Sequence, residues 1–241
     1  SQKRRLMYAV ILQNRFNPAM VKLKEAYDDG RFGEIALATI RLRWCREQAY
    51  YEDGWHGTWM MDGGVVNQQA FHHVDALQWV CGPIDRVVAI QSNAVNKLEA
   101  EDTMVASVQF AHGALGVIEV TTAARPKDLE ASLSVVGEKG LAVVGGIALN
   151  NIEMWEFVNQ QSDDKTIPKN FSQDVPTGYG LSHGIQIQEI IDRLSAGSIK
   201  PPIGGEDALP ALELVHALYR SVETNGWVSL KENPRSERLG Q

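Results

Sequence analysis

Cysteine, long apolar runs and basic clusters are all scarce in this 241-residue sequence. The two cysteines, Cys45 and Cys81, form no CxxC pattern, so neither a disulfide framework nor a structural zinc site is indicated, and a cytoplasmic protein is expected. No run of about 18 apolar residues occurs, and the first residues lack the pattern of a secretory signal. The sequence therefore predicts no association with a membrane.

Positive charge is outweighed by negative charge. There are 23 lysines and arginines against 30 aspartates and glutamates, a net charge of -7, and the one short basic cluster is KRR at residues 3–5. Nucleic acids and anionic membrane surfaces are bound through basic patches, so neither is expected as a partner. A small molecule is the more plausible ligand.

The short motifs of several enzyme classes are also absent. No GxGxxG follows a predicted strand, and GYGLSHG at 178–184 has histidine at the third glycine position and no strand before it. The sequence likewise lacks GxxxxGK[ST], HExxH, GxSxG and DxDxDG. These absences remove the usual signatures of nucleotide hydrolysis, zinc proteolysis, serine hydrolysis and calcium binding.

Apolar periodicity and turn residues predict an α+β fold. Strands are expected over residues 5–13, 34–44, 84–95, 102–110, 114–124, 129–137, 140–146 and 148–157, and helices over 18–29, 64–81, 183–196 and 206–224. Residues 159–181 are polar and contain proline and glycine, which indicates a long loop, either a functional lid or disordered. The strands alternate well, as where Ile40 and Leu42 flank Arg41, and they predict a large, mostly antiparallel open sheet with one packed face.

One helical segment, DGGVVNQQAFHHVDALQWVCG at 62–82, carries a polar stripe. On a continuous helix Gln68, His72 and Asp75 share one face, and apolar residues cluster opposite. A carboxylate one turn away can hold a histidine in one tautomer, which is a general-base arrangement. Two alternatives stay open: a packing histidine bonded to Asp75, or a metal site that needs a further ligand. His73 is expected at the side of the helix.

Several separated segments, in order, resemble the C-terminal part of the Gfo/Idh/MocA family of NAD(P)-dependent sugar oxidoreductases. They are QNRFNPAM, GRFGEI, WCREQAYYEDGWHGTWMMDGGVVNQQAFHHVDALQWVCG, EDTMVASVQFAHGALGVIEV, VVGEKG and GLSHGIQIQEII. The segments are most similar to the branch that contains UDP-N-acetylglucosaminuronate 3-dehydrogenases. The resemblance implies a sheet with helices on one face, binding of a sugar or sugar nucleotide, and a homodimer or homotetramer formed through the sheet.

The resemblance also implies a domain boundary. Residues 1–16 would be a remnant of the last strand and crossover of a Rossmann domain, and 17–241 the substrate-binding and oligomerisation domain. The glycine fingerprint and the EKP lysine of the family, which hydrogen-bonds the reacting hydroxyl, would precede residue 1. The chain is thus expected to be a fragment: the intact protein would use NAD or NADP, and this chain alone would neither bind it tightly nor turn over.

Catalytic roles follow by the same resemblance. His72 would take the hydroxyl proton as hydride leaves for nicotinamide. Gln68 stands where many members carry aspartate, and an amide cannot accept that proton, so His72 is left as the titrating group beside Asp75.

Binding roles are implied for residues outside that helix. Arg46 would clamp a carboxylate or phosphate, and Tyr51 and Trp55 would stack on a sugar or base. His183 would lie near the substrate. The alternatives are a surface arginine, packing aromatics and a helix-cap side chain.

Gln13 and Arg15 would lie near the nicotinamide half of the cofactor, with structural roles as the alternative. No metal is expected.

Three functions remain open at this point: the substrate domain of such a dehydrogenase, a redox-inactive sugar-binding or oligomerisation module, and a metal-dependent hydrolase or isomerase that uses His72 and Asp75.

Overall fold

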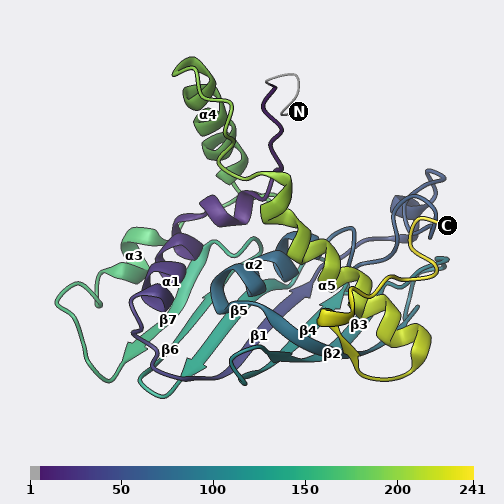
Figure 1. The fold of residues 1–241 in the computed structure, drawn as a ribbon, viewed down its shortest axis with the longest axis horizontal. Helices are drawn as coiled ribbons and strands as arrows, with labels where there is room; N and C mark the ends of the chain where they lie inside the picture. Colours follow the sequence, from purple (N-terminus) through teal and green to yellow (C-terminus); the bar gives the residue numbers. More distant parts are fainter. Residues whose placement is uncertain (1–5) are drawn as a thin grey trace.

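Eight strands form one sheet in the computed structural model of the chain, which describes residues 6–241 (Figure 1). The strands are β1 Ile35–Arg43, β2 Ile84–Ser92, β3 Thr103–Phe110, β4 Leu115–Thr121, β5 Glu130–Gly137, β6 Gly140–Gly145, β7 Asn151–Phe157 and β8 Val228–Ser229. Their order is β7-β6-β5-β1-β4-β3-β2-β8. Neighbours are antiparallel except β1 and β4, which run parallel. The predicted α+β fold with a mostly antiparallel open sheet is confirmed.

The helices of the described chain are α1 Pro18–Asp28, α2 Phe71–Cys81, α3 Ile167–Phe171, α4 Ser182–Ser195 and α5 Gly205–Thr224, with 3-10 helices η2 Gln13–Phe16, η3 Gln48–Tyr51 and η4 Leu230–Glu232. Figure 1 shows α1, α2 and α5 on the same side of the strands, and α4 projecting away from the sheet. Among residues 6–241 no helix is both long and apolar enough to cross a membrane.

Strand β1 lies near the centre of the sheet, and its side chains alternate between a packed and an open face. Ala38, Ile40 and Leu42 are fully buried under the helices. On the other face Arg41 lies opposite Glu119 of β4, with Nε 3.6 Å from a carboxylate oxygen. Burial of each large apolar side chain contributes about 1.5–3 kcal/mol, so this alternation holds the strand in one register.

Helix α2 begins at Phe71, seven residues later than the sequence predicts, because the preceding main chain is bonded to Glu101. The Val65 N–H donates to the Glu101 carbonyl at 2.9 Å, and the Val66 N–H donates to the Glu101 carboxyl at 3.1 Å. Gly64 permits this approach, since a Cβ there would lie 2.1 Å from that carboxyl. Residues 64–70 therefore form turns, and Gln68 does not lie on the helix that carries His72.

The predicted strand over 5–13 is wrong for the described residues 6–13; residue 5 lies outside them. Residues 6–12 have no regular structure. Their backbone groups pair with α4 instead of with a strand: the Leu12 N–H donates to Gln186 Oε1 at 3.1 Å, and Gln186 Nε2 donates to the Val10 carbonyl at 2.8 Å. The long loop expected over 159–181 contains the short helix α3.

The buried Glu101 carboxyl gives a prediction on how the free energy of unfolding depends on pH. Burial is the main cause that raises its pKa from 4.5 to about 8. Between these values the folded chain binds more protons than the unfolded chain, so the free energy of unfolding falls as pH rises through that window. We expect Glu101→Gln to flatten this fall, measured by urea denaturation between about pH 5 and about pH 9. Glu156→Gln, at an exposed position on β7, is the matched control, and an unchanged slope in Glu101→Gln would contradict the assignment.

Candidate active site

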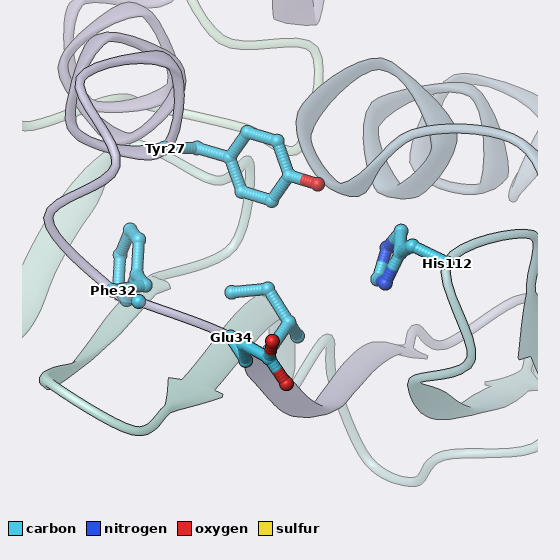
Figure 2. A pocket seen from close by; sticks show the side chains of 6 residues that line it. Tyr27, Phe32, Glu34 and His112 are labelled. Carbon is cyan, nitrogen blue, oxygen red and sulfur yellow. The ribbon is translucent and has the colours of Figure 1, made fainter.

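Two cavities lie at opposite ends of β1. The first, of about 330 Å³, adjoins Ile35 at the start of the strand, with Tyr27, Glu34 and His112 in its wall (Figure 2). The Tyr27 hydroxyl and His112 Nε2 both bond the Cys81 carbonyl, at 3.1 and 2.9 Å. Within residues 6–241, no side chain that lines this cavity has a buried nitrogen or oxygen without a hydrogen-bond partner. Nothing in its wall therefore requires a ligand.

The second cavity, of about 270 Å³, lies just beyond the other end of β1, and we call it the histidine cavity. Its lining comes from segments far apart in the sequence: Gln13, Asn14, Trp44, Arg46, Tyr50, Gln68, Gln69, His72, His73, Asp128, Thr177, Gly178, Tyr179 and His183. Of the predicted site residues it brings together Gln13, Arg46, Gln68, His72 and His183.

The end of β1 positions one wall of the histidine cavity. Beyond Arg43 the chain stays bonded to the end of β4, through Trp44 N–H to the Thr121 carbonyl at 2.9 Å and Arg46 N–H to the Thr122 carbonyl at 3.0 Å. Opposite this wall, the first turn of α2 carries His72 and His73. The cavity thus forms where the ends of β1 and β4 meet the start of α2.

Both adjacent histidines are held neutral. Burial, and then the nearby His183, lower the pKa of His72 to about 4. Burial, and then His72, lower that of His73 to about 3. Among the described residues, Nδ1 of His72 is buried and has no hydrogen-bond partner. A neutral imidazole with a free nitrogen can accept a proton from a ligand.

Arg46 is fixed on one side and open on the other. Its Nη1 donates to the Cys45 carbonyl at 2.7 Å and to Asp128 Oδ1 at 3.2 Å. Its guanidinium carbon lies 5.1 Å from the centre of the Trp44 ring and 5.6 Å from that of Tyr50. Within residues 6–241 neither Nε nor Nη2 makes a hydrogen bond, so one two-donor edge remains for a carboxylate or phosphate.

Asp75 does not orient His72. Its carboxylate accepts from Arg15 Nε at 3.0 Å and from Nη2 at 2.7 Å, and Nη2 also reaches the Asp207 carbonyl at 2.9 Å. The predicted carboxylate–histidine bond is wrong because Arg15 takes both carboxylate oxygens. The late start of α2 removes Gln68 from the predicted stripe, but not His72 or Asp75. Any catalytic role of Asp75 stays a prediction.

Tyr51 and Trp55 lie outside the lining of the histidine cavity. The Tyr51 hydroxyl is buried against Thr122 Oγ1 at 2.7 Å. Trp55 is 42% exposed and stacks on His56 with ring centres 3.6 Å apart. Neither residue is placed to stack on a ligand in this cavity.

Other lining residues were not predicted from the sequence. Tyr50 lines the cavity, whereas the sequence favours its neighbour Tyr51. His73 is 3% exposed and lies in the cavity wall instead of at the side of the helix, and Asp128 comes from a loop. The adjacent histidines were the available signal for His73. Among residues 6–241 there is no group of three or more histidine, cysteine, aspartate or glutamate side chains that could hold a metal ion.

The Arg15–Asp75 pair gives a stability prediction. The Asp75 side chain is 2% exposed, so Arg15→Met leaves a buried carboxylate unpaired. We expect this change to lower the free energy of unfolding by about 3 kcal/mol, and Arg15→Met combined with Asp75→Leu to recover much of the loss. Urea denaturation of the two single variants and the double variant tests this. Additive losses would show that the residues are not paired.

The burial of His72 gives a prediction on pH. Because its pKa in the folded chain is near 4 and the ordinary value is 6.5, His72 should remain neutral down to about pH 5 in an NMR titration. The unfolded chain binds this proton more readily, so His72 lowers stability as pH falls from 6.5 towards 4. We expect His183→Ala to raise the pKa only slightly, since burial is the larger cause. Protonation of His72 near its ordinary pKa would contradict this burial.

Comparison with known proteins identifies the domain. Residues 24–230 match the model of the oxidoreductase family, C-terminal alpha/beta domain. The chain is similar to the WlbA dehydrogenase from Bordetella pertussis, solved in complex with NADH and UDP-GlcNAcA, with 36% identity, a TM-score of 0.84, and coverage of 95% of this chain and 64% of that chain. It is 25% identical to inositol 2-dehydrogenase from Rhizobium meliloti over 224 residues, 90% of this chain and 63% of that protein.

Myo-inositol 2-dehydrogenase from Thermotoga maritima is likewise 25% identical, over 225 residues, 90% of this chain and 63% of that protein. The chain thus spans a little under two thirds of the length of these relatives. The match of the family model over most of the chain shows that it belongs to the Gfo/Idh/MocA oxidoreductases, as their C-terminal α/β domain.

Proposed function

We propose that this domain binds the sugar or sugar-nucleotide substrate of an NAD(P)-dependent dehydrogenase, and that His72 accepts the proton of the hydroxyl that is oxidised. The observation that carries the proposal is the histidine cavity itself, which holds a neutral imidazole among buried polar atoms that have no partner within residues 6–241. Buried polar groups are nearly always hydrogen-bonded, so unpartnered ones in one cavity favour a polar ligand.

The polar atoms suit a polyhydroxylated ligand. Oε1 of Gln13 and Oε1 of Gln68 are buried acceptors without partners in the described chain. Gln68 Nε2 is already used, since it donates to the Tyr50 hydroxyl at 2.8 Å. Two free acceptors fit the hydroxyl donors of a sugar, and the amide at Gln68 leaves His72 as the base beside them.

The open edge of Arg46 favours a ligand that also carries an anionic group. Arginine binds carboxylate and phosphate through two parallel N–H bonds, and the contacts of Arg46 with Asp128 and Trp44 fix that edge in place. The ligand in the structure of the Bordetella relative, UDP-GlcNAcA, is a sugar nucleotide. A substrate of that class supplies both the hydroxyls and the anionic group.

Of the two residues expected near the nicotinamide, Gln13 is placed to contact a cofactor and Arg15 is not. Gln13 lines the histidine cavity, and the second lone pair of its buried Oε1, beside the one proposed for a sugar hydroxyl, fits a contact to the amide of nicotinamide. Arg15 does not fit, because Asp75 and Asp207 occupy its guanidinium. NAD(P), when bound, supplies the acceptor for hydride. The residues of this chain bind and orient the sugar and hold the proton at His72.

The uncovered face of the sheet is the proposed contact between copies of the chain. Leu37 of β1 lies between Leu115 of β4 and Val136 of β5, and all three are at least 40% exposed. Beyond this apolar row Arg43 pairs with Glu119 and Glu130. A row of exposed apolar side chains with ion pairs beside it is suited to packing against a second sheet.

Binding measurements test the role of Arg46. We expect titration calorimetry to show that the chain binds UDP-GlcNAcA more tightly than UDP-GlcNAc, and that Arg46→Gln weakens binding by about 10- to 100-fold. Arg41→Gln, on the uncovered face of the sheet, is the matched control. Equal binding by the Arg46 variant would contradict the clamp.

Turnover tests the role of His72. In the protein that joins this domain to its cofactor domain, we expect His72→Asn to lower kcat by about 10²- to 10⁴-fold, because the hydroxyl loses its base. The 241-residue chain alone should reduce no NAD. Measurable reduction by the chain alone, or full activity of the variant, would contradict the proposal.

A further inference from the structure

A continuous hydrogen-bonded chain runs from the histidine cavity to the protein surface. Gln68 Nε2 donates to the Tyr50 hydroxyl at 2.8 Å, that hydroxyl lies 3.0 Å from His56 Nε2, and His56 Nδ1 lies 2.6 Å from Asp53 Oδ2. Tyr50 and Gln68 line the cavity. The His56 and Asp53 side chains are 12% and 40% exposed. The chain thus joins the cavity to the exposed surface through three titratable groups, Tyr50, His56 and Asp53.

The chemistry of these groups fixes the direction of the bonds. An amide nitrogen only donates and an ionised carboxylate only accepts. Tyr50 therefore accepts from Gln68 and gives its own hydrogen to Nε2 of neutral His56, whose proton is then on Nδ1 facing Asp53. This is the phenol–imidazole–carboxylate order in which the phenol can pass its proton outward as it accepts another.

The His56 ring is held on both of its faces and at Nδ1. The imidazole lies between the Trp55 ring, with centres 3.6 Å apart, and the Tyr50 ring, with centres 4.3 Å apart. The two aromatic rings and the Asp53 carboxylate, 2.6 Å from Nδ1, hold the imidazole in one orientation. The position of Trp55, which does not line the cavity, is explained by this stack.

On the cavity side of this chain an added proton is disfavoured. His72 is buried and lies near His183, so a proton that it accepts is not held there. Arg46 faces Tyr50 at 5.6 Å and Tyr179 lines the same cavity, while Asp53 and Asp62 are the acidic groups near His56. A proton is thus disfavoured on His72 inside the cavity, whereas the His56 imidazole has a partly exposed carboxylate beside it.

We propose that Tyr50, His56 and Asp53 form a proton relay that carries the proton released by sugar oxidation from the cavity to solvent. The inference rests on the proposed function. The substrate C–H bond breaks and its hydride goes to NAD(P)⁺, while the hydroxyl proton goes to His72. Tyr50 Oη takes that proton through the hydroxyls of the bound ligand as its own O–H bond breaks and an N–H bond forms at His56 Nε2. The imidazolium, paired with Asp53, then loses its Nδ1 proton to solvent, and proton exchange with solvent returns the neutral ring to the tautomer with its proton on Nδ1.

Kinetics of the protein that joins this domain to its cofactor domain test the relay. We expect Tyr50→Phe and His56→Ala each to lower kcat by about 10- to 100-fold with KM changed less than about twofold, and added imidazole to restore His56→Ala. Tyr27→Phe and His112→Gln, at the other cavity, remove the same chemical groups and should leave kcat unchanged. Variants of Tyr50 and His56 with unaltered kcat would overturn the relay.

Nitrogen NMR of the 241-residue chain tests the relay without turnover. The relay requires neutral His56 to carry its proton on Nδ1, and it is overturned if that proton is on Nε2. His72→Asn separates the two proposals. If that variant keeps full activity, the proposed function fails, and the His56 tautomer still decides the relay. If it loses activity while Tyr50→Phe and His56→Ala do not, only the relay fails.

Discussion

The attachment of residues 64–66 to Glu101 is the interaction on which the rest of the site depends. Two N–H groups that would otherwise begin a helix donate to Glu101, and its carboxyl also accepts from the Tyr219 hydroxyl of α5 at 3.1 Å. This buried carboxyl thereby ties the approach to α2, the loop before β3 and a long helix to one point. The helix then starts at Phe71, which places His72 in its first turn and in the wall of the histidine cavity.

The charged groups at the cavity are neutralised by contacts with one another or by burial. The two strong charges nearest to the ligand space, Arg46 and Asp128, contact each other, and the buried imidazoles are neutral. The interior is therefore polar without a net charge, which suits hydroxyl groups, and one arginine edge is left for an anion. Farther out, His56 contacts the partly exposed Asp53, which is the route we propose for a proton released in the cavity.

The strands were predictable because their signal is local. Alternation around Ile40 and Leu42 of β1, or Met104 and Val108 of β3, reports burial directly. The start of α2 was not predictable from local signals. Glu101, which bonds the residues before the helix and so delays its start, lies more than thirty positions away from them in the sequence. The contact of Asp75 with Arg15 is hidden for the same reason. The residue types in the site were recognisable, but their pairing depends on long-range contacts.

The same dependence on three-dimensional contacts explains why the sequence does not distinguish Tyr50 from Tyr51 as the residue that lines the cavity. Adjacent tyrosines in a 3-10 helix point in different directions, and the sequence does not reveal which one faces the cavity.

The most direct test of the central claim is to map the binding of UDP-GlcNAcA on the histidine side chains of this chain by NMR. We expect the His72 and His183 resonances to shift on binding and His112, at the other cavity, to remain unchanged. A shift at His112 with none at His72 would contradict the assignment of the site.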